Sequence, residues 1–137
     1  MNPPRRKKLP SDPREWLTHA RSDLRLAKLG VTADVLPEQV CFHAQQAVEK
    51  AFKAVLLHTA TDFPLTHDLE ELLDLLARAG IAVPKELVEA GDLTPYAVES
   101  RYPGFWGEIT EPDMREALSV AETAVIWAGE RLQQTSP

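Results

Sequence analysis

The fold is decided by the stretch Val40-Cys41-Phe42-His43-Ala44-Gln45-Gln46-Ala47-Val48-Glu49-Lys50-Ala51-Phe52-Lys53-Ala54-Val55, in the middle of the longest periodic segment of the chain. Its apolar side chains recur at intervals of three and four residues, which is the spacing of one face of an α-helix. Pro37 suits the first turn of such a helix, where its missing N–H would have no partner. We therefore predict a helix from residue 37 to about residue 59.

The same spacing predicts a helix before this segment, over residues 12–29. Ser11 or Asp12 can cap it by accepting hydrogen bonds from its first N–H groups, and Pro13 suits its first turn. Gly30 supplies a stop after it.

Residues 66–100 contain two shorter helical patterns. Thr66 caps the first, whose leucine stripe runs to a stop at Gly80. The second covers residues 84–100 and contains Gly91 and Pro95, so we expect it to be broken or kinked.

A last helix begins at a variant capping box, Thr110 with Asp113, and extends to about residue 133. No alternating apolar pattern long enough for a strand occurs. Amphipathic helices must bury their stripes against one another, so the predicted fold is all-α, an antiparallel up-and-down helical bundle of four to five helices. We expect residues 11–134 to form a single domain.

The charge of the chain is unevenly distributed. Residues 1–10 hold Arg5, Arg6, Lys7 and Lys8 and no acid, and we expect them to form a disordered basic N-terminal tail. The rest has 11 basic and 21 acidic residues, a formal charge of −10. Because an acidic body repels phosphate backbones, RNA is a disfavoured partner.

Cys41 is the only cysteine, which excludes an intramolecular disulfide and fits a reducing compartment. No signal peptide pattern appears, and no stretch approaches the roughly 20 apolar residues of a membrane span. We therefore expect a soluble, cytoplasmic protein. The histidines lack metal-ligand spacing, and neither a nucleophile elbow nor a glycine-rich phosphate loop appears, so no metal, cofactor or catalytic residue is assigned.

Four polar side chains, His43, Gln46, Lys50 and Lys53, share one stripe of the predicted 37–59 helix. At about 100° per residue they fall within roughly 80°, beside the apolar face. A stripe with cations, an amide and an imidazole is suited to hold an anion. The alternative, favoured by residue types alone, is a solvated helix edge on which Glu49 and Lys53 form an i,i+4 ion pair.

Two other positions are suited to bind a phosphate group. His67 lies at a predicted helix start, where free N–H groups attract anions, although it can equally be a plain first-turn residue. Arg101 and Tyr102 follow the predicted 84–100 helix, where a guanidinium can clamp phosphate and a phenol ring can stack on a base. The alternative for Arg101 is to satisfy the last carbonyls of its helix.

Three blocks together resemble the HEPN domain family: Cys41 to Ala51, Thr66-His67-Asp68-Leu69, and Tyr96 followed by Arg101-Tyr102-Pro103. The match spans roughly residues 12–133. Members are helical bundles, often dimeric, and are commonly encoded beside a minimal nucleotidyltransferase with which they form a toxin–antitoxin-like pair. The resemblance implies a homodimeric module that binds an ATP-like nucleotide and pairs with such a nucleotidyltransferase.

The resemblance also implies a shared cleft between the 37–59 and 84–100 helices. Its lining is expected to be His43, Gln46, Lys50, Lys53, His67, Arg101 and Tyr102. Ribonuclease members carry an arginine, four to six residues and then a histidine, but Arg101 has no histidine in that range, so we expect the module not to be catalytic. Two alternatives stay open, namely a ribonuclease that uses His43 or His67 and a structural dimer without a small ligand.

Overall fold

The structure is a computed structural model that describes residues 9–97 and 108–134. Its α-helices are α1 (Pro13–Thr32), α2 (Pro37–His58), α3 (Leu69–Arg78) and α4 (Glu111–Gln133). Two 3-10 helices, η1 (Lys85–Leu87) and η2 (Ala90–Ala97), lie between α3 and α4. No β-strand occurs in these two described stretches, and the prediction of an all-α helical bundle is confirmed.

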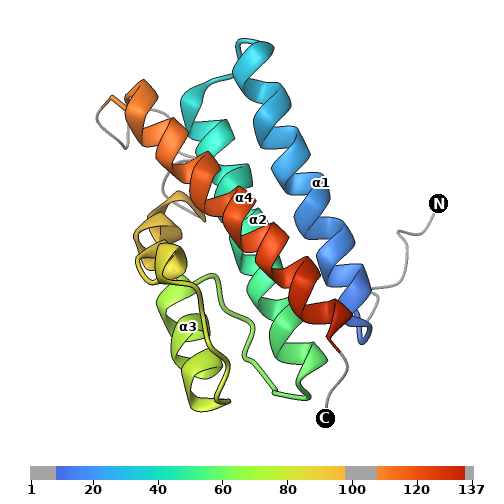
Figure 1. The fold of residues 1–137 in the computed structure, drawn as a ribbon. Helices are drawn as coiled ribbons and strands as arrows, with labels where there is room; N and C mark the ends of the chain where they lie inside the picture. Colours follow the sequence, from blue (N-terminus) through green and yellow to red (C-terminus); the bar gives the residue numbers. More distant parts are fainter. Residues whose placement is uncertain (1–8, 98–107, 135–137) are drawn as a thin grey trace, which may run out of the picture.

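The long helices α1, α2 and α4 pack against one another, and α3 lies with η2 on the flank of α2 (Figure 1). α1 and α4 are antiparallel, because Lys28 pairs with Glu122 at 3.2 Å while Arg21 lies near Gly129. α2 and α4 end together, with His58 Nε2 3.2 Å from the carbonyl oxygen of Gln134. They run in the same direction, because α4 begins at the end of the bundle where α2 begins (Figure 1).

The core is built mainly on α2. Its buried face is rich in alanine, and such small side chains allow α1 and α4 to approach it closely. Phe52 is completely buried and meets the edge of Trp127 of α4, with ring centroids 6.0 Å apart. Among the described helices, none combines the length and the hydrophobicity that crossing a membrane requires.

Gly30 does not end the first helix, contrary to the prediction. α1 continues to Thr32, and Asp34, with a φ of +57°, begins the turn into α2. Gly30 is buried inside α1, and a Cβ there would lie 3.0 Å from Cγ2 of Val40. The glycine thus serves the close approach of α1 and α2 rather than a helix stop.

Two other predicted helix signals also differ from the structure. The cap of α3 is Asp68, whose carboxylate accepts hydrogen bonds from the N–H groups of Glu70 and Glu71, whereas Thr66 accepts from the N–H of Asp68. Within residues 84–97 the chain forms the 3-10 turns η1 and η2 instead of an α-helix. Pro95 lacks the N–H that an α-helix would need at its position.

Other predicted signals are confirmed. Thr110 and Asp113 form a reciprocal capping box at the start of α4, with hydrogen bonds of 2.9 and 3.2 Å. Gly80 follows the end of α3 with a φ of +76°, a conformation that glycine adopts without strain.

Candidate functional site

Five of the seven predicted binding residues lie in the described part of the chain. They are His43, Gln46, Lys50 and Lys53 on α2, and His67 just before α3. Arg101 and Tyr102 lie outside the described residues. In the structure the five residues belong to two hydrogen-bonded sets. Each set is centred on a carboxylate that was not among the predicted binding residues.

Asp23 of α1 organises the first set. Its Oδ1 lies 3.1 Å from Nδ1 of His43, and its Oδ2 accepts a hydrogen bond of 2.6 Å from Nζ of Lys50. All three side chains are partly buried between α1 and α2. Asp23 directly precedes the buried Leu24 and therefore lies at the edge of the apolar stripe of α1. This position is the feature of the sequence that could have indicated Asp23 as a site residue.

Glu49 of α2 organises the second set. Its Oε2 accepts from Nζ of Lys53 at 2.9 Å, and its Oε1 lies 2.7 Å from Nδ1 of His67. Gln45 donates to the same Oε1 at 3.3 Å. The carboxylate therefore has a partner for each oxygen, as a buried charge requires.

The predicted i,i+4 ion pair of Glu49 and Lys53 is confirmed, but the prediction that it lies on a solvated edge is wrong. The two side chains are only 4% and 5% exposed. Trp16 of α1 and Phe63 cover the ammonium of Lys53, whose Nζ lies 5.5 and 5.7 Å from their ring centroids. These rings contribute cation–π attraction but also shield Lys53 from any ligand in solution.

Both sets have the same arrangement, in which one carboxylate joins a histidine Nδ1 to a lysine Nζ. An ionised carboxylate can only accept, so a neutral imidazole in either set would carry its hydrogen on Nδ1 and present Nε2 as an acceptor. The side chain of His67 is 59% exposed, whereas that of His43 is 26% exposed. His67 is therefore the member of the two sets that is most accessible to a ligand.

Gln45 and Gln46 connect α2 to the segment before α3. Gln46 donates to Oε1 of Gln45 at 2.6 Å, and Gln45 donates to the backbone oxygen of His67 at 3.2 Å. This chain of amides fixes the backbone at His67 while Glu49 fixes its ring. The exposed imidazole is thus held in place before any ligand arrives.

The buried Cys41 does not offer a nucleophile. Burial raises the pKa of its thiol to about 11, and burial likewise raises the pKa of the neighbouring Tyr96 to about 12. The reactive form of cysteine is the thiolate, which is therefore scarce near neutral pH. In the described stretches, no group of three or more His, Cys, Asp or Glu side chains is arranged to hold a metal ion.

Comparison with known proteins gives matches over nearly the whole chain. The HEPN domain model matches residues 13–132. The crystal structure of TT1696 from Thermus thermophilus is 32% identical with a TM-score of 0.72, over 87% of this chain and 97% of that one. The crystal structure of ST0689, described as an archaeal HEPN homologue, is 25% identical with a TM-score of 0.71, over 89% of this chain and 98% of that one. No curated protein gives a match.

Proposed function

Because the chain belongs to the HEPN domain family, we propose that it is a nucleotide-binding module that pairs with a minimal nucleotidyltransferase in a toxin–antitoxin-like system. In this proposal the module is a cytoplasmic homodimer, binds an ATP-like nucleotide and has no catalytic activity of its own. Family membership supports the pairing and the ligand class.

The observation that carries the nucleotide proposal is the fixed and exposed imidazole of His67. Glu49 holds its Nδ1 at 2.7 Å, so Nε2 is the ring nitrogen available to a ligand. Nε2 accepts from a ribose hydroxyl or an amino group when the ring is neutral, and donates to a phosphate oxygen when it is protonated. Lys50 is partly exposed on α2, and its ammonium would contact a phosphate only in competition with Asp23, whose Oδ2 lies 2.6 Å from its Nζ.

Calorimetric titration with ATP and other nucleotides tests this site. We expect binding to the full chain and a loss of about tenfold or more in affinity for His67→Ala, because a charged hydrogen bond contributes on the order of 1.5–3 kcal/mol. His58→Ala is the matched control, since His58 is the last residue of α2 and its Nε2 lies 3.2 Å from the carbonyl oxygen of Gln134, outside both sets. An equal effect of the two substitutions would exclude His67 from the site.

The proposed partner is tested by co-expression with a minimal nucleotidyltransferase encoded beside this gene. We expect the two proteins to co-purify, and sedimentation to show a homodimer of this chain. If no nucleotide binds and no partner co-purifies, both parts of the proposal are lost.

A ribonuclease is the second candidate, and the pairing of Glu49 with His67 favours it. A buried carboxylate that orients an exposed imidazole is the arrangement of a general base, in which Nε2 would take the proton of an RNA 2′-hydroxyl. Incubation of the protein with tRNA or mRNA tests it, and we then expect His67→Ala to abolish cleavage. Cleavage that survives Arg101→Ala would exclude the family-like site, and absence of cleavage would exclude the enzyme.

A further inference from the structure

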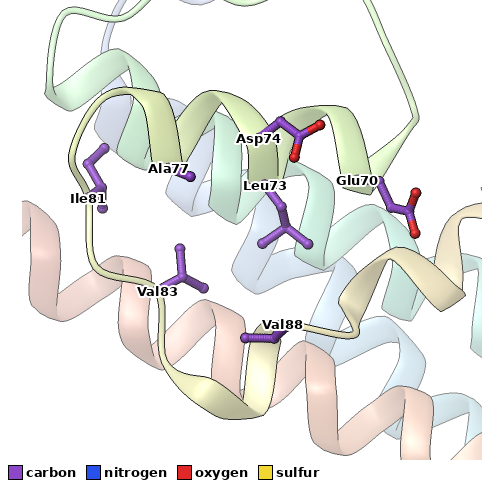
Figure 2. Close-up of a pocket in the computed structure, with 7 residues that line it drawn as sticks. All are labelled: Glu70, Leu73, Asp74, Ala77, Ile81, Val83 and Val88. Carbon is purple, nitrogen blue, oxygen red and sulfur yellow. The ribbon is translucent and has the colours of Figure 1, made fainter.

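A groove separate from the two sets of α2 lies between α3 and the chain that follows it (Figure 2). Its volume is about 430 Å³. From α3 it is lined by Glu70, Leu73, Asp74 and Ala77, and from the following segment by Ile81, Val83 and Val88. Leu73 points across the hollow toward Val83 and Val88 (Figure 2).

The groove offers an apolar surface that the described chain leaves uncovered. Val88 is 63% exposed, and Leu73 and Val83 are only partly buried. A hollow of this size with this lining accepts one or two apolar side chains, and the burial of each would favour binding.

Two carboxylates, those of Glu70 and Asp74, border the groove one helical turn apart. The stem of Glu70 rests on η2, where a Cβ at Gly91 would lie 2.3 Å from its Cγ. Glycine at position 91 thus leaves room for Glu70 at this border. In the described part of the chain, neither Glu70 nor Asp74 forms an ion pair, so both carboxylates can take cationic partners.

Acidic side chains are concentrated in the segments that form this groove, whereas basic side chains are concentrated in residues 1–10. Residues 68–92, which contain α3 and the segment after it, hold seven acidic and two basic side chains, a net charge of −5. Residues 1–10 hold four basic side chains and no acidic one, and they also contain Leu9. An acidic border around an apolar hollow is complementary to a segment that combines several cations with an apolar side chain.

We propose that the groove binds residues 1–10 of a second copy of this chain, with Leu9 in the hollow and the cations of Arg5–Lys8 against Glu70 and Asp74. Leu9 is exposed, while the next residue, Pro10, is held at the start of α1 by Trp16, whose Nε1 donates to its backbone oxygen at 3.0 Å. α1 and α3 lie on opposite sides of the bundle in Figure 1, and on this separation we assign the segment in the groove to another copy.

A labelled peptide with the sequence of residues 1–10 tests the groove directly, with binding measured by fluorescence anisotropy. The receptor is the full chain with Arg5, Arg6, Lys7 and Lys8 all changed to Gln, so that its own segment does not compete. We expect saturable binding that weakens as salt is added. Glu70→Gln with Asp74→Asn should weaken binding about tenfold, and Val88→Gln or a peptide with Leu9→Ser several-fold.

The matched control is Glu15→Gln with Glu130→Gln, which removes the same charge from exposed positions outside the groove. Equal weakening in the control would show general attraction to an acidic body and overturn the proposal, as would the absence of binding at millimolar peptide. Sedimentation then compares the native chain with the Arg5–Lys8 variant. A mixture of isotope-labelled and unlabelled native chains, cross-linked from position 9 to the groove, then separates the two copies, and cross-links within one copy alone would overturn the assignment to a second copy. Nucleotide binding at His67 is independent of either result.

Discussion

Glu49 and Lys53 form an ion pair from which water is almost excluded, with Oε2 and Nζ 2.9 Å apart. Gln45 and His67 complete the hydrogen bonds of the carboxylate, and the rings of Trp16 and Phe63 cover the ammonium. In such a pair the desolvation cost of each charge is offset only while its partner is present. The ion pair therefore links the stability of the bundle to the position of His67.

Removal of one member of this pair should be strongly destabilising. We expect Lys53→Ala to lower the free energy of unfolding by about 3–5 kcal/mol, because Glu49 is left buried without its cation. Urea denaturation measures the change. Lys28→Ala is the control, since its ion pair with Glu122 is half-exposed and should contribute no more than about 1 kcal/mol. Comparable losses for the two variants would contradict the account of the buried pair.

The cap of α3 gives a second prediction. Asp68→Ala should destabilise the protein by about 1 kcal/mol, because two N–H groups of the first turn lose their acceptor. Thr66→Ala should cost less, since Thr66 only accepts from the N–H of Asp68 before the helix begins. Thermal denaturation of both variants decides between the two residues. A larger loss of stability for Thr66→Ala would show that Thr66 is the cap.

The raised pKa of Cys41 predicts slow alkylation. With a folded-state pKa of about 11 against 9.0 in the unfolded chain, we expect iodoacetamide at pH 8 to react on the order of 100-fold more slowly with the folded protein. The same chain in urea is the control, and equal rates would refute the burial of the thiol. Because the neutral thiol is favoured by folding, this contribution to stability is complete below pH 9.0 and is lost as the pH rises through about 11.

The capping box of α4 should make stability depend on acid pH. Hydrogen bonds from the backbone and side chain of Thr110 lower the pKa of Asp113 below its usual 3.8. A carboxylate with a lowered folded-state pKa stabilises the fold above the unfolded value, and this effect is lost as the pH falls through the folded value. We therefore expect Asp113→Ala to be destabilising at pH 7 and nearly neutral in strong acid. Thermal denaturation across this range checks it, with the exposed Asp62→Ala as the control, and a pH-independent loss would argue against the mechanism.

Helices were predictable where the local pattern and the packing agree. The apolar spacing along Val40–Val55 is the spacing of a buried face, and the box of Thr110 with Asp113 is complete within four residues. The prediction that Gly30 ends the first helix was wrong, because a glycine that ends a helix and a glycine that allows a neighbouring helix to approach look alike in sequence. Only the position of Val40, set by the packing of α1 on α2, separates the two cases.

The carboxylates of the site could not be found from local patterns. Asp23 and Lys50 are 27 positions apart, and their contact depends on how far α1 is shifted along α2. The burial of Lys53 depends in the same way on Phe63, which comes from a segment without helical periodicity. The polar stripe of α2 was visible in the sequence, but which of its members are neutralised by partners was not.

The antiparallel arrangement of α1 and α4 has a consequence for engineering the molecule. Since α1 runs opposite to α4, the first turn of α1 and the last turn of α4 lie at the same end of the bundle (Figure 1). A short linker could therefore join the two ends, and new ends could be opened in the turn between Thr32 and Pro37. Such a circular permutant would retain the helix packing around α2 and would place residues 1–10 between α4 and α1.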